Sequence, residues 1–337
     1  MADILILGGT RNIGHFTALS LLEAGHRVTV LNRGVTPDGL PPQVERLRAD
    51  RRDTAQMRAA LDTLSFDLVL DTTTYDGDDA RQAVELFGGT TDRFIFVSSG
   101  QVYLVRENLS RPYREEDYEG PLMAEPASDS GDHGDWKYGT GKRDAEDVFS
   151  AAAAASGFPL TTLRLPMVAS ERDDKGRIQC YIARILDRGP FLVPDEQGLP
   201  LRHIYVQDVA RLVTSLAVAE KGIGRAYNIS HGESMPLDEL IVNLSTIIGV
   251  EVHVIRKPRA ELEEDRLLPH CSPFSGRWMS ELDNRRSIEE LGMTYTPPET
   301  YLRNLVEDYR SRWSREDIIP LGLSQRQREI LAAYPVT

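Results

Sequence analysis

The chain has 337 residues, of which 41% are hydrophobic and 27% are charged. These proportions are those of an ordinary globular protein, and they disfavour a disordered chain or one inserted in a membrane. The formal net charge of -13 opposes binding along the phosphates of a nucleic acid, which requires a basic surface.

The first 30 residues predict a strand, a glycine loop, a helix and a second strand. An apolar strand at 4–7 is followed by a loop that contains Gly8, Gly9 and Gly14. A helix is expected from about residue 13 to 24, and a second strand at 27–31. This succession is a βαβ unit.

The same alternation continues along the chain. After the first unit we expect a strand from Leu47, a helix at 54–64, a strand at 66–70, a helix at 78–87, a strand at 94–97, a helix at 136–156 and a strand at 161–165. Such alternation predicts an α/β fold with a doubly wound parallel sheet of the Rossmann type. Residues 104–135 interrupt it, and their acidic, aperiodic sequence predicts a surface loop, either a lid or an insertion without a role.

The composition changes after Pro166, where short elements alternate with Gly/Pro loops. We expect the Rossmann domain at 1–165, with a returning segment at 203–230 that contains a strand at 203–206 and a helix at 207–219. We expect a smaller α+β substrate lobe at 166–202 and 231–337. Its predicted elements are a helix at 236–249, a strand at 250–255 and further structure at 284–312, whereas residues 313–337 show no period.

The glycine loop predicts a dinucleotide site. Glycines between a strand and a helix let backbone N–H groups approach a pyrophosphate, and the start of a helix favours an anion. The spacing is not the usual G-x-G-x-x-G. Gly8 and Gly14 hold the outer positions of a G-x-x-G-x-x-G pattern, and Arg11 replaces its middle glycine. The residues expected to contact the cofactor here are Gly8, Thr10, Arg11, Asn12, Ile13 and Gly14.

The end of the second strand predicts the choice of cofactor. An NAD site usually has an acidic residue there for the ribose hydroxyls, whereas an NADP site has arginine. Here Asn32 and Arg33 occupy these positions, and Arg11 is a second candidate for the 2′-phosphate. We therefore expect NADP(H) in preference to NAD(H). Asp50 and Thr72, after the next two strands, complete the expected cofactor contacts.

Tyr138 and Lys142 form a Y-x-x-x-K pattern at the start of the long helix. Positions i and i+4 share a helix face, and an ammonium beside a phenol favours the phenolate. The tyrosine could then exchange a proton with a substrate hydroxyl while hydride moves to or from nicotinamide. Ser99, at the end of the preceding strand, could donate a hydrogen bond to the same oxygen. The two helix glycines would make room for cofactor or substrate.

Together these motifs resemble the extended short-chain dehydrogenases/reductases, which include sugar-nucleotide epimerases, dehydratases and reductases. The resemblance rests on GGTRNIG at 8–14, VSSGQVY at 97–103, YGTGK at 138–142, RLPMV at 164–168 and HIYVQDVARLV at 203–213. It implies Ser99, Tyr138 and Lys142 as the catalytic triad, with Lys142 also on the nicotinamide ribose. It further implies a homodimer formed through a helix bundle.

Two departures from the family pattern narrow the function. The Asp-Glu pair of the 4,6-dehydratases is replaced by Gly100 and Gln101, which disfavours 4,6-elimination. The asparagine-containing stretch that follows the fourth strand in the family is replaced by Asp71 to Tyr75. We therefore expect an NAD(P)(H)-dependent reductase or epimerase that acts on a secondary alcohol or ketone. The expected substrate is a sugar nucleotide. Because of the arginine in its glycine loop, the chain also resembles an atypical branch of the family that includes chloroplast stem-loop-binding proteins. This resemblance keeps a non-catalytic RNA-binding alternative open.

The expected partners follow from the same features. We expect a small-molecule substrate and no nucleic-acid or membrane partner. We also expect no metal site, since the two cysteines, Cys180 and Cys271, form no metal spacing. The sequence shows no secretory signal and no apolar run near the roughly 20 residues of a membrane helix. A cytoplasmic location is therefore expected.

Overall fold

The computed structural model describes residues 1–186, 188, 191–196, 201–268 and 272–312. The described residues divide into two compact units. The first contains residues 1–168, 202–232 and 280–295, and the second contains those within 169–201, 233–279 and 296–312. The first unit thus includes residues 280–295, although the sequence predicts them in the C-terminal lobe. Cys271 and the tail from 313 onward lie outside the described residues.

The first unit is built on a parallel sheet, as predicted, and this sheet has seven strands. The strand expected at 203–206 pairs with β7 (Met167–Ala169) outside this sheet, and the seventh strand, at 225–228, was not predicted. Its strands are β1 (Asp3–Leu7), β2 (Arg27–Asn32), β3 (Glu45–Arg48), β4 (Phe66–Asp71), β5 (Thr91–Ser99), β6 (Leu160–Leu165) and β10 (Arg225–Asn228). Their order in the sheet is β10-β6-β5-β4-β1-β2-β3. The order reverses between β1 and β4, and ligands of such sheets bind beyond the carboxyl ends of the strands at this point.

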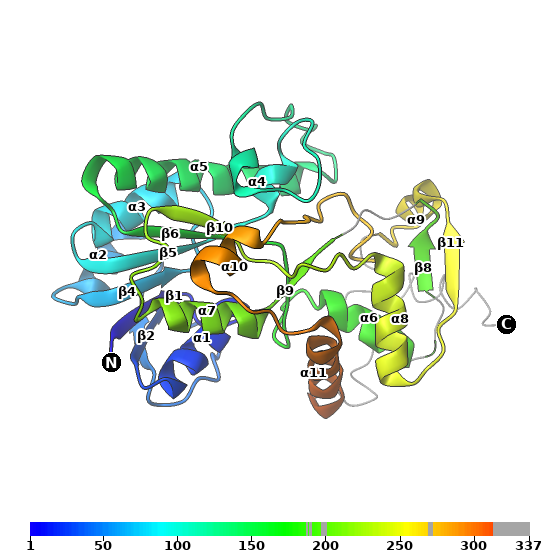
Figure 1. Ribbon diagram of the computed structural model, residues 1–337, viewed down its shortest axis with the longest axis horizontal. Coiled ribbons are helices and arrows are strands. Elements are labelled where there is room, and N and C mark those ends of the chain that lie inside the picture. Colours follow the sequence, from blue (N-terminus) through cyan, green and yellow to red (C-terminus); the bar gives the residue numbers. More distant parts are fainter. Residues whose placement is uncertain (187, 189–190, 197–200, 269–271, 313–337) are drawn as a thin grey trace. The chain divides into compact units, whose positions relative to one another are not determined.

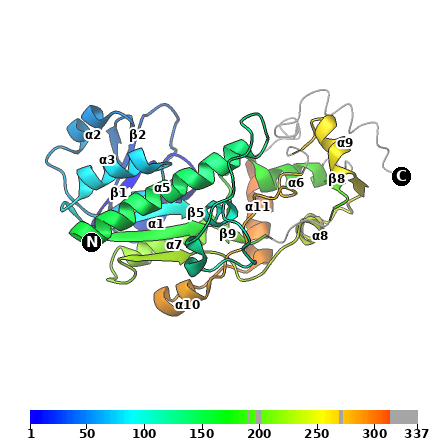
Figure 2. The ribbon, with the colours of Figure 1, turned by 90° about the horizontal axis from the view of Figure 1, so that it is seen from above.

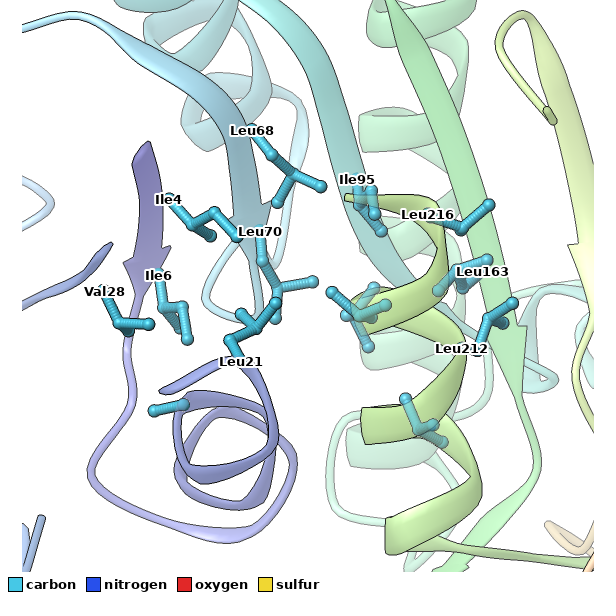
Figure 3. Close-up of a cluster of buried hydrophobic side chains, with 14 of the residues drawn as sticks. Ile4, Ile6, Leu21, Val28, Leu68, Leu70, Ile95, Leu163, Leu212 and Leu216 are labelled. Carbon is cyan, nitrogen blue, oxygen red and sulfur yellow. The ribbon is translucent and has the colours of Figure 1, made fainter. Parts of the chain in front are cut away.

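Helices cover both faces of this sheet (Figures 1 and 2). One face carries α1 (Asn12–Glu23) and α7 (Val206–Leu216), and the other carries α2 (Thr54–Leu61), α3 (Gly77–Phe87) and α5 (His133–Ser156). Alternate residues of β1 enter the two cores, because successive side chains of a strand point to opposite faces. Ile4 and Ile6 lie in the α1–α7 core (Figure 3), whereas Leu5 and Leu7 lie in the core under α3 and α5.

Capping residues set the ends of these helices. The side chain of Asp53 accepts the N–H of Gln56 at the start of α2, and Asp76 does the same with Asp79 at the start of α3. Gly157 ends α5 in the left-handed conformation, with a φ of +71°. The shorter elements of the first unit are α4 (Gln101–Leu104), η1 (Glu115–Tyr118), β9 (His203–Tyr205) and α10 (Arg285–Leu291), and β9 pairs with β7 (Met167–Ala169).

The second unit has both helices and strands. Its elements are α6 (Arg177–Leu186), β8 (Phe191–Pro194), α8 (Leu237–Ile248), β11 (Val254–Lys257), α9 (Arg259–Glu264) and α11 (Pro298–Arg312). Strands β8 and β11 pair in parallel, and α6, α8 and α11 pack together. The strand expected at 250–255 begins only at Val254. Among the described residues, no helix is both long enough and apolar enough to cross a bilayer.

Candidate functional site

The loop between β1 and α1 is closed tightly by its glycines. Gly8 and Gly9 have φ angles of +113° and +84°, a region that favours glycine. A Cβ on Gly8 would lie 2.4 Å from Oγ1 of Thr72, and a Cβ on Gly14 would lie 2.6 Å from the backbone nitrogen of Gly9. The loop therefore brings the first turn of α1 to the carboxyl ends of β1 and β4, and Thr72 lies directly against it.

The start of α1 is suited to an anion. Arg11 occupies the N-cap position without a side-chain hydrogen bond to the helix, and the first turn contains no acidic residue. The first N–H groups of a helix have no intrahelical acceptor, so they are available to a phosphate. In addition, Oδ1 of Asn12 is buried and has no hydrogen-bond partner in the described part of the chain. These features fit the pyrophosphate and a hydroxyl group of a dinucleotide.

The other predicted cofactor residues in this region have varied surroundings. Arg11 is exposed, Thr10 is half-buried in the bend before α1, and Ile13 packs against the α1–α7 core. Asp50 lies in the turn between β3 and α2, where its Oδ1 accepts the N–H of Arg52 at 3.0 Å. The side chain of Asp50 thus stabilises its own turn.

Asn32 anchors the end of β2. Its Nδ2 donates to the carbonyl oxygen of Gly8 at 3.2 Å, and its Oδ1 accepts the N–H of Gly34 at 2.8 Å. The same oxygen accepts a hydrogen bond from the guanidinium of Arg48, at the end of β3. Arg48 lies so close to Gly34 that a Cβ there would be 2.9 Å from its Nε. Arg33 and Arg48 are both exposed, so two guanidiniums follow the ends of adjacent strands.

Asp71 organises the loop after β4. Its carboxylate is completely buried and pairs with Arg51 at 2.7 Å. It also accepts the N–H groups of Thr73 and Thr74 and the hydroxyl of Thr74. Burial alone would raise the pKa of Asp71, but the charge of Arg51 and these hydrogen bonds together lower it. The loop is therefore held by an ionised carboxylate beneath it.

The two glycines of YGTGK let α5 pack closely against the chain itself. A Cβ on Gly139 would lie 2.9 Å from the carbonyl oxygen of Gln101, after β5, and a Cβ on Gly141 would lie 2.6 Å from that of Tyr75, after β4. The expectation that these glycines make room for cofactor or substrate is thus corrected. They allow α5 to lie between the segments that follow β4 and β5, and this places Tyr138 at the carboxyl edge of the sheet.

Lys142 is buried at this edge. Its Nζ donates to the carbonyl oxygens of Thr74 at 2.6 Å and Val97 at 2.9 Å, and it lies 5.8 Å from the centre of the Tyr138 ring. Burial lowers the pKa of Lys142 to about 8, although the charges of Asp71 and Glu146 favour the ammonium. Two of its three N–H bonds are used within the chain, which leaves one for a ligand or for Tyr138.

Ser99 ends β5, and its Oγ accepts the N–H of Gln101 at 3.2 Å. The neighbouring Ser98 points to the other side and donates to the carboxylate of Glu146. Glu146 lies one turn beyond Lys142 on α5 and forms a buried ion pair with Arg164 of β6 at 2.6 Å. This ion pair joins α5 to β6, and the hydrogen bond from Ser98 joins α5 to β5. Ser99, Tyr138 and Lys142 are therefore carried by elements that are bound to one another.

The structure corrects the expectation of a surface loop for part of residues 104–135. Tyr113 and Tyr118 are buried, in a cluster that includes Leu282. Glu115 is also buried, and its carboxylate accepts the N–H of Asn228 at 2.8 Å. Isolated tyrosines give no periodic signal, which is why the sequence did not reveal this packing. Most residues from 119 to 131 are exposed, as expected of a surface loop.

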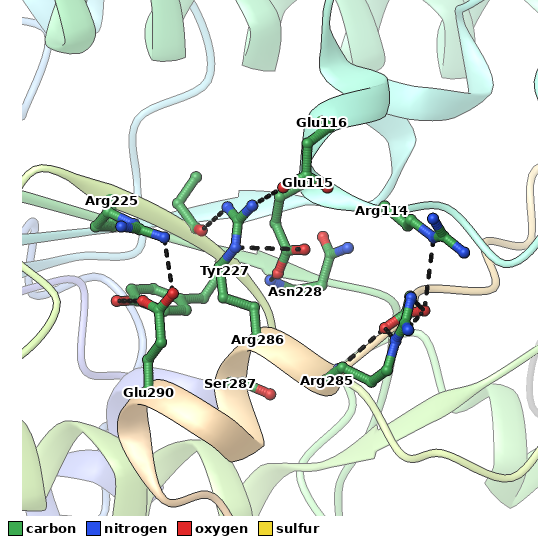
Figure 4. A network of polar contacts seen from close by, with 12 residues as sticks. Arg114, Glu115, Glu116, Arg225, Tyr227, Asn228, Arg285, Arg286, Ser287 and Glu290 are labelled. Atoms are coloured by element: carbon green, nitrogen blue, oxygen red, sulfur yellow. Dashed lines mark hydrogen bonds and ion pairs between the residues drawn. The ribbon is translucent and has the colours of Figure 1, made fainter.

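The segment 280–295 contacts the same region. Arg286 on α10 pairs with Glu116 and lies 3.9 Å from Glu115, as Figure 4 shows. Glu290 accepts hydrogen bonds from Arg225 and from the hydroxyl of Tyr227, both on β10. These contacts attach α10 to the edge strand of the sheet, and they explain why a segment so late in the chain belongs to the first unit.

Sequence comparison identifies relatives of the chain. It is 25% identical to the chloroplast stem-loop binding protein of 41 kDa b of Arabidopsis thaliana over 251 residues, which are 70% of this chain and 61% of that protein. The chain thus covers less than two thirds of that relative. It is 23% identical to the 2'-dehydrokanamycin reductase of Streptomyces kanamyceticus over 283 residues, with 82% of this chain and 75% of that protein covered.

Solved structures share the fold. The UDP-glucose 4-epimerase of Thermotoga maritima aligns with a TM-score of 0.71 and 21% identity, over 91% of this chain and 98% of that one. The UDP-glucose 4-epimerase of Thermus thermophilus aligns with a TM-score of 0.71 and 19% identity, over 92% and 99%. The sequence profile of one family matches residues 4–230, which include the glycine loop, Ser99, Tyr138 and Lys142. The chain therefore belongs to the NAD dependent epimerase/dehydratase family.

Proposed function

We propose that this chain is an NADP(H)-dependent reductase or epimerase that acts on a secondary alcohol or ketone of a sugar nucleotide or a similar polyol. The main support is the arrangement on α5, where the ammonium of Lys142 lies 5.8 Å from the ring centre of Tyr138 at the carboxyl ends of β4 and β5. Ser99 ends β5 at the same edge. Membership of the NAD dependent epimerase/dehydratase family supports the same class of reaction.

The residues of the first unit suit the proposed cofactor. The glycine loop and the start of α1 would hold its pyrophosphate, and Arg33 and Arg48 would pair with a 2′-phosphate. An acidic residue at position 32 would repel that phosphate, whereas Asn32 is neutral and already holds Arg48. When bound, the nicotinamide supplies or accepts the hydride.

The proton is handled by side chains of this chain. In reduction, the hydroxyl of Tyr138 donates its proton to the ketone oxygen, and in oxidation the phenolate takes the proton from the alcohol. The ammonium of Lys142 stabilises the phenolate through its charge. The hydroxyl of Ser99 donates a hydrogen bond to the reacting oxygen and orients it.

The surroundings of Gly100 support reduction or epimerisation over 4,6-elimination. A Cβ at Gly100 would lie 2.3 Å from Oγ and 2.8 Å from Cβ of Ser280, so an acidic side chain does not fit at this position. Gln101 donates to the carboxylate of Asp135 at 2.8 Å and is not acidic. The relative named 2'-dehydrokanamycin reductase favours a keto group on a sugar-like ring as the substrate.

The experiment begins with the purified protein. It is denatured, and mass spectrometry identifies any dinucleotide that it releases. The protein is then assayed with NADPH against 4-keto sugar nucleotides and simple ketones, and with sugar nucleotides alone for epimer formation. We expect turnover of at least one compound that carries a ring ketone or secondary alcohol. If the protein neither binds a nicotinamide dinucleotide nor turns over any panel member, the proposal is wrong.

The similarity to the chloroplast stem-loop binding protein supports a second candidate, a non-catalytic RNA-binding protein. The ion pairs near α10 in the first unit oppose it. Three arginines near α10 are paired with carboxylates: Arg225 with Glu290, Arg285 with Asp283 and Arg286 with Glu116. Paired guanidiniums are not available to phosphates without loss of these ion pairs. The enzyme therefore remains the proposed function.

A further inference from the structure

Tyr75 is a large aromatic residue that the fold holds at the carboxyl edge of the sheet. Its N–H donates to Oδ2 of Asp79 at 2.9 Å, and its carbonyl group lies against Gly141 of α5. The preceding residue, Thr74, is buried and bound to Asp71. The backbone is thus fixed on both sides, yet Tyr75 remains 51% exposed.

The ring of Tyr75 lies beside the two residues of the Y-x-x-x-K motif. Nζ of Lys142 is 5.2 Å from its centre, within the range of a cation–π interaction. The Tyr138 ring is 6.4 Å away at an interplanar angle of 54°. Phe96 lies 4.9 Å from the same ammonium. Three aromatic rings therefore surround Lys142, and the half-exposed Tyr75 forms the part of this enclosure nearest to solvent.

We propose that Tyr75 is a positioning residue for Lys142. The ring of Tyr75 covers the ammonium of Lys142 and holds it against the carbonyl groups of Thr74 and Val97. This contact between the Tyr75 ring and the Lys142 ammonium needs neither cofactor nor substrate. Only its consequence for catalysis, through Lys142 and Tyr138, rests on the proposed function.

The proposal predicts the sign of a change in the pKa of Lys142. The ring attracts the ammonium, which favours the charged form, but it also excludes water, which disfavours it. Charged groups on four neighbouring segments also act on Lys142, namely Asp71, Glu146, Arg51 and Asp79. Burial by all the surrounding groups is the largest influence on this pKa. Without the ring, water would reach the ammonium, so we expect Tyr75→Ala to raise the pKa of Lys142.

The test measures the reactivity of individual lysines. The chain has five lysines, and Lys137 lies exposed on the same helix as an internal reference. The full-length protein is labelled with trace acetic anhydride over a range of pH, and the labelling of each lysine is measured by peptide mass spectrometry. The variants are Tyr75→Ala and Tyr75→Phe. Leu64→Ala is the matched control, because Leu64 has a similar exposure and lies just before the start of β4, at the end of the strand opposite to Tyr75.

In Tyr75→Ala we expect the plateau rate of Lys142 to rise several-fold relative to Lys137, and its midpoint to rise by about one pH unit. Tyr75→Phe keeps the ring, so it should retain the wild-type curve, as should Leu64→Ala. If the pH dependence of Lys142 labelling in Tyr75→Ala is the same as in the wild-type protein, the ring of Tyr75 does not cover the ammonium and the proposal is wrong. Because the labelling needs no bound ligand, this result would be independent of whether the proposed reaction occurs.

Discussion

Nζ of Lys142 lies 2.6 Å from the carbonyl oxygen of Thr74, and this hydrogen bond joins α5 to the loop that follows β4. The same amine reaches the carbonyl oxygen of Val97 in β5. Lys142 therefore has a structural role that is separate from any effect on Tyr138. A substitution of Lys142 will change both the packing of α5 and the charge near Tyr138. Experiments on the two residues of the motif must separate these effects.

The first prediction concerns proton transfer. Tyr138→Phe removes only the hydroxyl, so the ring still packs and cofactor binding should remain. Turnover should fall by about 100-fold or more, since positioned proton transfer contributes that much. Steady-state kinetics on an identified substrate, with calorimetric titration of NADPH, measures both quantities. A variant with undiminished turnover would exclude Tyr138 as the general acid and base.

The second prediction concerns Lys142 and pH. Its pKa is about 8 in the folded protein and about 10.4 in an unfolded chain, so between these values the unfolded state binds more protons and stability rises with pH. Relative to Lys142→Met, the wild-type free energy of unfolding should increase by up to about 3 kcal/mol across this window. Urea unfolding of both proteins at several pH values checks it. Parallel curves would contradict it.

The third prediction concerns the choice of cofactor. Arg33→Ala and Arg48→Ala should each weaken NADPH binding and leave NADH binding almost unchanged, because each removes a guanidinium that would face only the 2′-phosphate. Arg48 also anchors on Asn32, so Arg48→Lys should restore only part of the difference. Calorimetric titration with both dinucleotides distinguishes these outcomes. Tighter binding of NADH by the wild-type protein would show that the preference is wrong.

The fourth prediction concerns the buried ion pair of Glu146 and Arg164. Glu146→Ala leaves the Arg164 guanidinium buried without its carboxylate, which should cost about 3–5 kcal/mol of stability. The double variant Glu146→Leu, Arg164→Met removes both charges and should be less destabilised than the single one. Denaturant unfolding gives both values. If the double variant loses at least as much stability as the single one, burial of an unpaired charge is not the cause.

The fifth prediction concerns nucleic acid. With a net charge of -13 and the arginines near α10 paired, the protein should show no saturable RNA binding at physiological salt. Filter binding with a stem-loop RNA measures this directly. Saturation at low micromolar RNA, with a steep dependence on salt, would instead favour the binding-protein candidate.

Local patterns predicted much of the fold and some of the candidate site. Apolar runs that alternate with helical segments predicted the parallel sheet, and the Y-x-x-x-K spacing located Tyr138 and Lys142 on one helix. The roles of Arg48, Tyr75 and the YGTGK glycines could not be predicted, because each depends on a contact between segments that are distant in sequence. Arg48 meets Asn32 only when β3 pairs with β2, and Gly141 meets Tyr75 only when α5 packs against the segment that follows β4.

The attachment of residues 280–295 to the first unit determines where the chain can be divided. A fragment that ends at Gly232 would retain every strand of the seven-stranded sheet but lose Leu282 from the tyrosine cluster and Asn284, which donates to the carbonyl oxygen of Ser230. It would also expose the side of β10 that Glu290 covers. Deletion mapping or two-hybrid fragments designed from the family match to residue 230 would therefore expose the tyrosine cluster and leave the edge strand β10 uncovered, and such pieces should aggregate.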